Sequence, residues 1–199
     1  MLANAQPAES LPALRGAAEE VWNIGNLYGG EYQADMFVSA KDESNATESR
    51  VQQDAGKYHI LHLAAHGALE PSNPMFSALL LSGDAKNDGR LNAHEVYDLD
   101  LRDTTLVVLS ACDTSLGQRS RGDEMIGLSR AFMHAGTPSV LASLWKVDDR
   151  ATLQFMRHFY FELAAGKDKA RALRAAQRLT RIHYPNPRAW AGFVLIGRP

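Results

Sequence analysis

The sequence contains a single cysteine in 199 residues, so no disulfide can form within the chain. We therefore expect no need for an oxidising compartment, and zinc sites built on Cys-x-x-Cys pairs are excluded. Basic and acidic residues nearly balance, with a formal net charge of −2. The chain as a whole thus offers no electrostatic attraction for nucleic acid or an anionic membrane. We expect no metal, no cofactor and no direct nucleic-acid binding.

Long apolar runs are missing as well. No stretch approaches the ~20 residues that a membrane-spanning helix needs. The first thirty residues also lack a basic segment followed by an apolar run of signal-peptide length. We therefore expect a cytoplasmic protein without membrane contact. Neither a Gly-x-Gly-x-x-Gly motif nor a Walker loop opens a helix, which argues against a nucleotide-binding domain.

The residues that are present are typical of a folded domain. Apolar residues make up 45% of the chain and charged residues 22%, and the length fits one domain. Residues 1–10 combine Ala, Pro and polar residues without a period, which predicts a flexible lead-in. The remaining residues, 11–199, are expected to form a single domain.

Strand-like and helix-like segments alternate along the chain. The apolar patterns predict strands over 34–39, 58–65, 78–81, 106–110, 139–144 and 190–196. They predict helices over 11–28, 93–97, 125–135 and 167–181, with a further helix after Asp149. Residues 78–91 read as a small hairpin. This order, with short connections, predicts an α/β fold in which helices flank a mostly parallel central sheet.

The strand predicted at Leu106–Ser110 leads directly to the single cysteine, Cys112. Its run of β-branched residues and leucines, without alternation, is typical of a strand that is buried on both faces of a parallel sheet. Ligand crevices of such sheets lie outside the carboxyl ends of the strands, which is where Cys112 falls. An earlier strand of the same character, residues 58–65, ends at His66.

His66 and Cys112 have the chemistry of a cysteine-nucleophile pair. The reactive species is the thiolate, and an adjacent imidazole accepts its proton and later returns it to a leaving group. The amides of Gly67 and Cys112 are candidate oxyanion donors. The alternatives are an inert buried thiol and an ordinary His-Gly turn. The 46 residues from His66 to the Ala-Cys pair are close to the roughly 50 of the caspase pattern.

Several motifs together resemble the CHAT domain, a family of caspase-like cysteine peptidases that is related to separase and often follows tetratricopeptide repeats. The likeness extends from about residue 11 to the end of the chain. It is carried by His66-Gly67, Leu109-Ser-Ala-Cys112 with Gly117, Phe132 with Ala135-Gly136, Ala142-Ser-Leu-Trp145-x-Val-Asp-Asp149, Phe159-Tyr160 and Trp190-Ala-Gly-Phe-Val-Leu-Ile-Gly197.

The resemblance implies a caspase-hemoglobinase fold and a catalytic dyad. Cys112 would be the nucleophile and His66 the general base and acid of an endopeptidase that cleaves a protein substrate. A second histidine, His62, would point to the same side of a straight strand, and we interpret it as packing. The family further implies regulation by a partner or an upstream repeat domain. It also implies a role in bacterial signalling or defence.

The resemblance also suggests a substrate pocket. Separase has a similar segment, Trp-Asp-Val-Thr-Asp, whose last aspartate recognises a basic residue before the cleaved bond. Carried over, Asp149 becomes the candidate base of an S1 pocket for Arg or Lys, with Asp148 a weaker candidate and Trp145 a possible wall. Asp113 either lines the pocket or caps a helix. Either aspartate could instead cap the helix that follows; we favour the cap for Asp148 and leave both roles open for Asp149.

Two features leave alternatives open. A basic stripe on the last predicted helix is either a solvated face or a docking surface for an acidic partner, such as a repeat domain. It consists of Lys167, Arg171, Arg174, Arg178 and Arg181. The whole chain is either an active peptidase or a catalytically silent interaction module, although both dyad residues are present.

Overall fold

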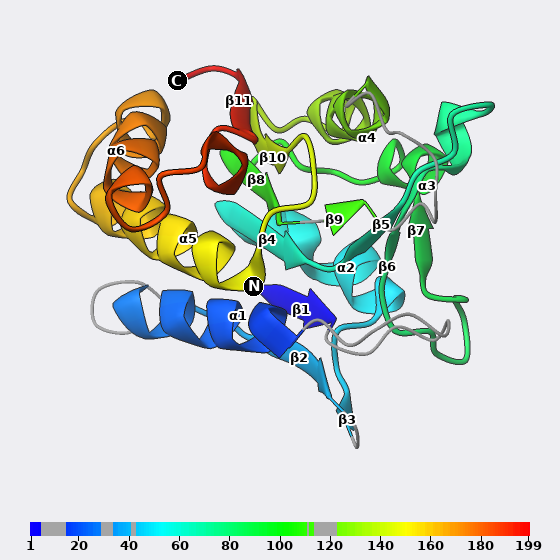
Figure 1. The fold of residues 1–199 in the computed structure, drawn as a ribbon. Coiled ribbons are helices and arrows are strands. Elements are labelled where there is room, and N and C mark those ends of the chain that lie inside the picture. Colours follow the sequence, from blue (N-terminus) through cyan, green and yellow to red (C-terminus); the bar gives the residue numbers. More distant parts are fainter. Residues whose placement is uncertain (5–14, 29–33, 41–42, 111, 114–122) are drawn as a thin grey trace.

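The structure, a computed structural model, describes residues 1–4, 15–28, 34–40, 43–110, 112–113 and 123–199. Its main sheet has seven strands in the order β11-β10-β8-β4-β1-β2-β3 (Figure 1). Five of these strands run parallel, and the edge strands β11 and β3 are antiparallel to their neighbours. The strands are β1 (Leu2–Asn4), β2 (Phe37–Ala40), β3 (Glu43–Ser44), β4 (Ile60–Ala64), β8 (Leu106–Leu109), β10 (Ser139–Ser143) and β11 (Phe193–Gly197).

Helices cover both faces of this sheet (Figure 1). One face packs against α1 (Arg15–Tyr28), α5 (Asp149–Ala164) and α6 (Lys169–His183). The other packs against α2 (Glu48–Asp54), α3 (Ala93–Val96) and α4 (Asp123–His134). Short 3-10 turns lie at η1 (Ala55–Lys57), η2 (Pro74–Phe76) and η3 (Pro187–Ala189). No helix among the described residues is both long and apolar enough to cross a bilayer.

The central strand β8 is buried on both faces, which explains its unbroken apolar sequence. Val107 and Leu109 belong to the core on the α4 side, whereas Leu106 and Val108 belong to the core on the α5 side. All four side chains are at most 1% exposed. The expected α/β architecture, with helices flanking a mostly parallel sheet, is therefore confirmed.

A second, four-stranded sheet follows the carboxyl end of the first. Its order is β7-β6-β5-β9, with β7 (Arg90–Asn92), β6 (Ala78–Leu80), β5 (His66–Ala68) and β9 (Cys112–Asp113). Strands β6 and β7 form the expected hairpin, and Gly89 in its turn has a φ of 89°. The hairpin places β5 between β6 and β9, so His66 starts an inner strand of this sheet.

The expected lead-in over residues 1–10 is wrong for Leu2–Asn4. These residues form β1, which pairs in parallel with both β2 and β4, and Leu2 is 3% exposed. Three residues with one large apolar side chain carry no detectable period, so only the neighbouring strands reveal the pairing. Residues 5–10 lie outside the described residues.

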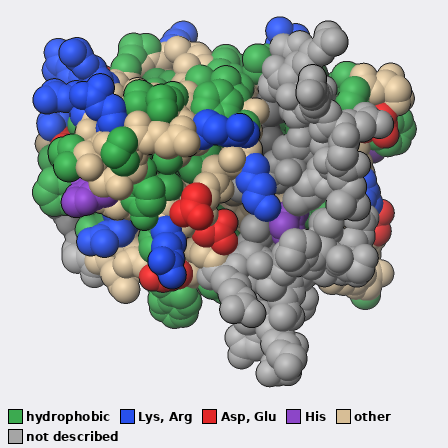
Figure 2. Space-filling view, viewed as in Figure 1, with side chains coloured by type: hydrophobic (Ala, Val, Ile, Leu, Met, Phe, Trp, Pro, Cys, Tyr) green, Lys and Arg blue, Asp and Glu red, His purple; other side chains and the backbone are tan. Residues whose placement is uncertain are grey.

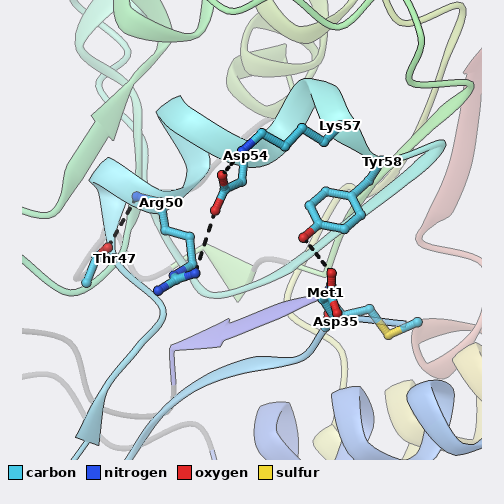
Figure 3. Close-up of polar contacts among 7 residues, drawn as sticks. All are labelled: Met1, Asp35, Thr47, Arg50, Asp54, Lys57 and Tyr58. Carbon is cyan, nitrogen blue, oxygen red and sulfur yellow. Dashed lines mark hydrogen bonds and ion pairs between the residues drawn. The ribbon is translucent and has the colours of Figure 1, made fainter. Parts of the chain in front are cut away.

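A partly buried polar contact lies at the amino edge of the main sheet. The hydroxyl of Tyr58, just before β4, donates to Asp35 Oδ2, just before β2, over 2.8 Å (Figure 3). Desolvation, followed by the hydrogen bond to this carboxylate, raises the pKa of Tyr58 to about 12. Thr47 caps α2 nearby by accepting from the Arg50 amide, and Arg50 lies 3.6 Å from Asp54 (Figure 3). The Tyr58–Asp35 contact therefore joins the segments that lead into β4 and β2, whereas the other two contacts lie within α2 and its cap.

Helix α4 ends against the loop that precedes β8, and only a glycine fits there. Gly136 has a φ of 124°, and a Cβ atom on it would come 2.8 Å from the backbone nitrogen of Arg102. Gly166, which follows α5, has a φ of 80°, but a Cβ atom there would meet nothing within 4 Å. Both glycines have a positive φ, but only at Gly136 would a side chain also clash with the backbone. Comparing the two positions therefore distinguishes the cost of the backbone conformation from the cost of the clash.

Replacing Gly136 with alanine should lower the free energy of unfolding by about 2–4 kcal/mol, because the methyl group adds a backbone clash to the strain of a positive φ. Gly166→Ala is the matched control and should cost only about 1 kcal/mol. Urea unfolding of both variants measures the difference. Equal losses would show that Arg102 does not confine the end of α4.

Candidate active site

The candidate site forms where two parallel strands leave the main sheet and enter the second one. Strand β4 leads through Ala65 to β5, and β8 leads to β9. Strands β5 and β9 are again parallel, with His66 in register with Cys112. In-register residues of neighbouring strands lie about 5 Å apart. The structure therefore places the backbone of Cys112 beside that of His66.

Ser110, directly after β8, is held by the backbone of β4. The amide of Ser110 donates to the carbonyl of Leu63 over 3.0 Å, which extends the pairing of β8 with β4. His66 itself is 3% exposed and lies between β6 and β9. Both dyad candidates thus lie on paired strands, which position side chains more precisely than loops do.

The expected oxyanion donors also lie in this second sheet. Gly67 is in register with Asp113, so the backbones of the two segments run side by side at the candidate nucleophile. Asp113 itself lies in β9. Ala111 and Gly117 lie outside the described residues.

Trp145 follows β10, but its side chain is engaged on the far side of that strand from β8. The indole Nε1 donates to the carbonyl of Arg188 over 2.9 Å. The ring also lies against Gly192, where a Cβ atom would come 2.8 Å from it. Both partners precede β11, which pairs with β10 on the side opposite β8. These contacts anchor the loop after β10.

The two aspartates after Trp145 have different environments. Asp148 is the N-cap of α5, and its carboxylate accepts from the amides of Arg150 and Ala151 over 3.0 and 3.2 Å. Asp149 is exposed, and its side chain lies against Gly16 of α1, where a Cβ atom would come within 2.9 Å. The capping alternative therefore holds for Asp148, whereas the carboxylate of Asp149 is not used in a cap.

His62, interpreted from the sequence as packing, belongs to a buried polar cluster. It is fully buried in β4, with Nδ1 2.9 Å from the hydroxyl of Tyr160 in α5. Its Nε2 lies 3.2 Å from Glu20 Oε1 of α1, at ion-pair distance but outside hydrogen-bond geometry. Glu20 Oε2 accepts from the hydroxyl of Ser110 over 3.1 Å. The sequence offered one hint, since Glu20 lies on the apolar face of α1 between Ala17 and Ile24.

A cavity of about 790 Å³ lies at the opposite, amino edge of the main sheet. It is bounded by Ile60 and Leu106, the first residues of β4 and β8, and by Tyr160 and Lys169. None of the described residues of the candidate site lines it. The dyad candidates and this cavity are therefore separate features.

The sequence profile of the CHAT domain family matches residues 2–198, nearly the whole chain. The protein belongs to the CHAT domain family. Human tetratricopeptide repeat protein 28 is 38% identical over 227 aligned residues, which cover 94% of this chain and 9% of that protein. The mouse protein of the same name is 37% identical over 109 residues, covering 54% of this chain and 4% of that protein. The CHAT domain thus spans less than a tenth of these relatives.

Solved structures of caspase-like cysteine proteinases share the fold. A crystal structure of the Arg-specific cysteine proteinase gingipain R matches with a TM-score of 0.64 and 12% identity. It covers all of this chain and 45% of that chain. A complex of the pro- and mature domains of Porphyromonas gingivalis RgpB matches with a TM-score of 0.58 and 13% identity, covering all of this chain and 46% of that one. The expected caspase-like fold is confirmed.

A buried carboxyl group, that of Glu48 in α2, binds the turn of the second sheet of the CHAT domain. It is 1% exposed, and its Oε2 accepts from the amide of Gly89 in the β6–β7 turn over 2.9 Å. Burial, followed by the nearby charge of Glu95, raises the pKa of Glu48 to about 7. Protonated Glu48 is therefore favoured in the folded state relative to the unfolded chain.

The sign of this shift makes the CHAT domain lose stability as the pH rises. The contribution of Glu48 is complete below its unfolded pKa near 4.5 and is lost between about pH 4.5 and pH 7. Glu48→Gln should remove this loss and raise the free energy of unfolding at pH 8 by about 1–3 kcal/mol relative to the wild type. Denaturant titrations at pH 5 and pH 8 measure it, with exposed Glu19→Gln as the control. An unchanged pH dependence in Glu48→Gln would assign the loss to other groups.

Proposed function

We propose that this CHAT domain is a cysteine endopeptidase that cleaves a protein substrate through Cys112 and His66. The observation that carries the proposal is the register of β5 and β9, in which these two residues are direct partners. The chain contains one thiol, so no other cysteine competes for the role of nucleophile. The family and the fold belong to the cysteine-peptidase type.

In the proposed reaction His66 acts first as a base and then as an acid, once during acylation and once during deacylation. His66 takes the proton of the Cys112 thiol, and the thiolate attacks the scissile carbonyl carbon. The resulting oxyanion accepts hydrogen bonds from the amides of Gly67 and Cys112. His66 then gives its proton to the departing amine as the C–N bond breaks. His66 next takes a proton from water, which attacks the thioester carbonyl, and returns that proton to the Cys112 sulfur as the C–S bond breaks.

Asp149 is the proposed recognition group for a basic residue before the cleaved bond. Both aspartates are exposed, but one feature supports Asp149 over Asp148: the Asp148 carboxylate is already committed to capping α5. A guanidinium would pair with the Asp149 carboxylate through two charge-assisted hydrogen bonds. Asp113 is a further proposed contact of this subsite. Trp145, a possible wall from the sequence, is instead engaged by Arg188 and Gly192 on the side of β10 away from β8.

A repeat domain is the proposed regulator. The relatives are tetratricopeptide repeat proteins, of which the CHAT domain is a small part. The face that fits an acidic partner is on α6, where Arg171, Arg174, Arg178 and Arg181 are exposed and no residue is acidic. Figure 2 shows Lys and Arg side chains gathered in this region, at the upper left of the view. Only Arg171 of these four has a described carboxylate partner, Asp168 at 3.2 Å.

Replacing Cys112 with alanine should abolish cleavage of an arginine-containing peptide library, and His66→Ala should lower kcat by about 10³-fold or more, because both remove part of one reacting unit. His59→Ala is the control, since His59 is an exposed histidine just before β4. Peptide cleavage and thermal unfolding are measured together. Residual cleavage by a folded Cys112→Ala protein would overturn the mechanism. A peptidyl electrophile that never labels Cys112 would favour the silent interaction module.

Asp149→Ala should lower kcat/KM for peptides with Arg or Lys before the cleaved bond by about 10- to 100-fold. It should leave kcat/KM unchanged for peptides with a neutral residue at that position. The matched control is Asp148→Ala, which removes the cap of α5 and should cost about 1 kcal/mol of stability without changing the ratio of basic to neutral cleavage. Library profiling of the three proteins measures that ratio. A ratio unaltered by Asp149→Ala would place the specificity group elsewhere.

A further inference from the structure

The polar cluster of Glu20, His62, Ser110 and Tyr160 joins four elements in the interior of the domain. Tyr160 and His62 are 0% exposed, and Glu20 is 4% exposed. The cluster lies where α1 and α5 pack on β4 and on the end of β8. Buried carboxyl and imidazole groups in an otherwise apolar layer cost free energy unless their partners stay in place. Such a cluster therefore favours one arrangement of the elements that it joins.

The contacts of Glu20 run toward the candidate nucleophile. Its Oε2 receives the Ser110 hydroxyl at 3.1 Å, and its Oε1 faces His62 Nε2 at 3.2 Å. His62 is held on its other side by the Tyr160 hydroxyl, 2.9 Å from Nδ1. Glu20 Oε1 accepts no hydrogen bond from any of the described residues. The position of the Glu20 carboxylate thus depends on His62 and Ser110 together.

Ser110 is fixed at two points. Its amide is bound to the Leu63 carbonyl at 3.0 Å, and its hydroxyl is bound to Glu20. Two residues later the chain enters β9 at Cys112, in register with His66. His62, in turn, lies four residues before His66 on the strand that continues into β5. The cluster therefore contacts both strands just before they present the dyad candidates.

We propose that Glu20, His62 and Ser110 are positioning residues for the Cys112–His66 pair. They hold the end of β8 against β4, and so fix the register in which the thiol meets the imidazole. The inference rests on the proposed peptidase function. A misplacement of about 1 Å in a reacting group can lower a rate by about 100-fold, so a contact two residues away is sufficient to matter.

The pH dependence of Cys112 alkylation by iodoacetamide tests this directly, because Cys112 is the only thiol in the chain. A thiol paired with an imidazole has a pKa below the ~8.5 of free cysteine. Ser110→Ala and Glu20→Leu should each move the pH midpoint of alkylation toward ~8.5 and slow alkylation at pH 7 about three- to tenfold. Both variants break the same Ser110–Glu20 hydrogen bond. The double variant should therefore be alkylated no more slowly than the slower single variant.

The matched control is Thr104→Val, at the opposite end of β8. Thr104 is 0% exposed, and its hydroxyl donates to the carbonyl of Tyr58 over 2.8 Å. The Thr104→Val variant should lose about as much thermal stability as Ser110→Ala and Glu20→Leu, but keep the wild-type pH midpoint of alkylation. A wild-type midpoint below ~8.5 that Ser110→Ala and Glu20→Leu leave unchanged would overturn the positioning role and leave the proposed dyad intact. A wild-type midpoint near ~8.5 would overturn the dyad itself.

Discussion

The parallel pairing of two strands beyond the main sheet sets the distance between His66 and Cys112. Strand β4 continues into β5 and β8 continues into β9, and both pairs stay parallel across the break. Each strand is buried before it leaves the sheet, so neither can slide without exposing the core. The candidate site is therefore a consequence of the core packing, since the same register that buries Val107 and Leu109 aligns His66 with Cys112.

The sequence alone could predict the parts of this arrangement that depend on local pattern. The unbroken apolar run at Leu106–Leu109 indicates a strand buried on both faces, and in the structure all four residues of β8 are buried. The positive φ of Gly136 after α4 likewise matches the helix end expected there. Strands β1 and β9 were not predicted, because segments of three and two residues have no period. They become strands only through their neighbours, Leu63 for Leu2 and His66 for Cys112.

The candidate site was predictable to a similar extent. His66 and Cys112 could be paired from their spacing and from the family likeness, and the role of Asp148 as a cap followed from its place before an expected helix. His62 is the instructive case. The sequence pattern placed it correctly inside the fold, but its partners Glu20 and Tyr160 are 42 and 98 residues away, and no local rule connects them. A glutamate on the apolar face of α1 is the one local sign of this cluster.

The most direct test of the paired strands is a crystal structure of the domain after reaction with a peptidyl electrophile that carries arginine next to the reactive group. We predict a covalent bond to the Cys112 sulfur, β9 paired with β5 in the register of Cys112 with His66, and the His66 ring within hydrogen-bonding distance of that sulfur. An adduct in which β9 pairs in another register, or in which the His66 ring lies beyond the reach of the Cys112 sulfur, would contradict the proposed dyad.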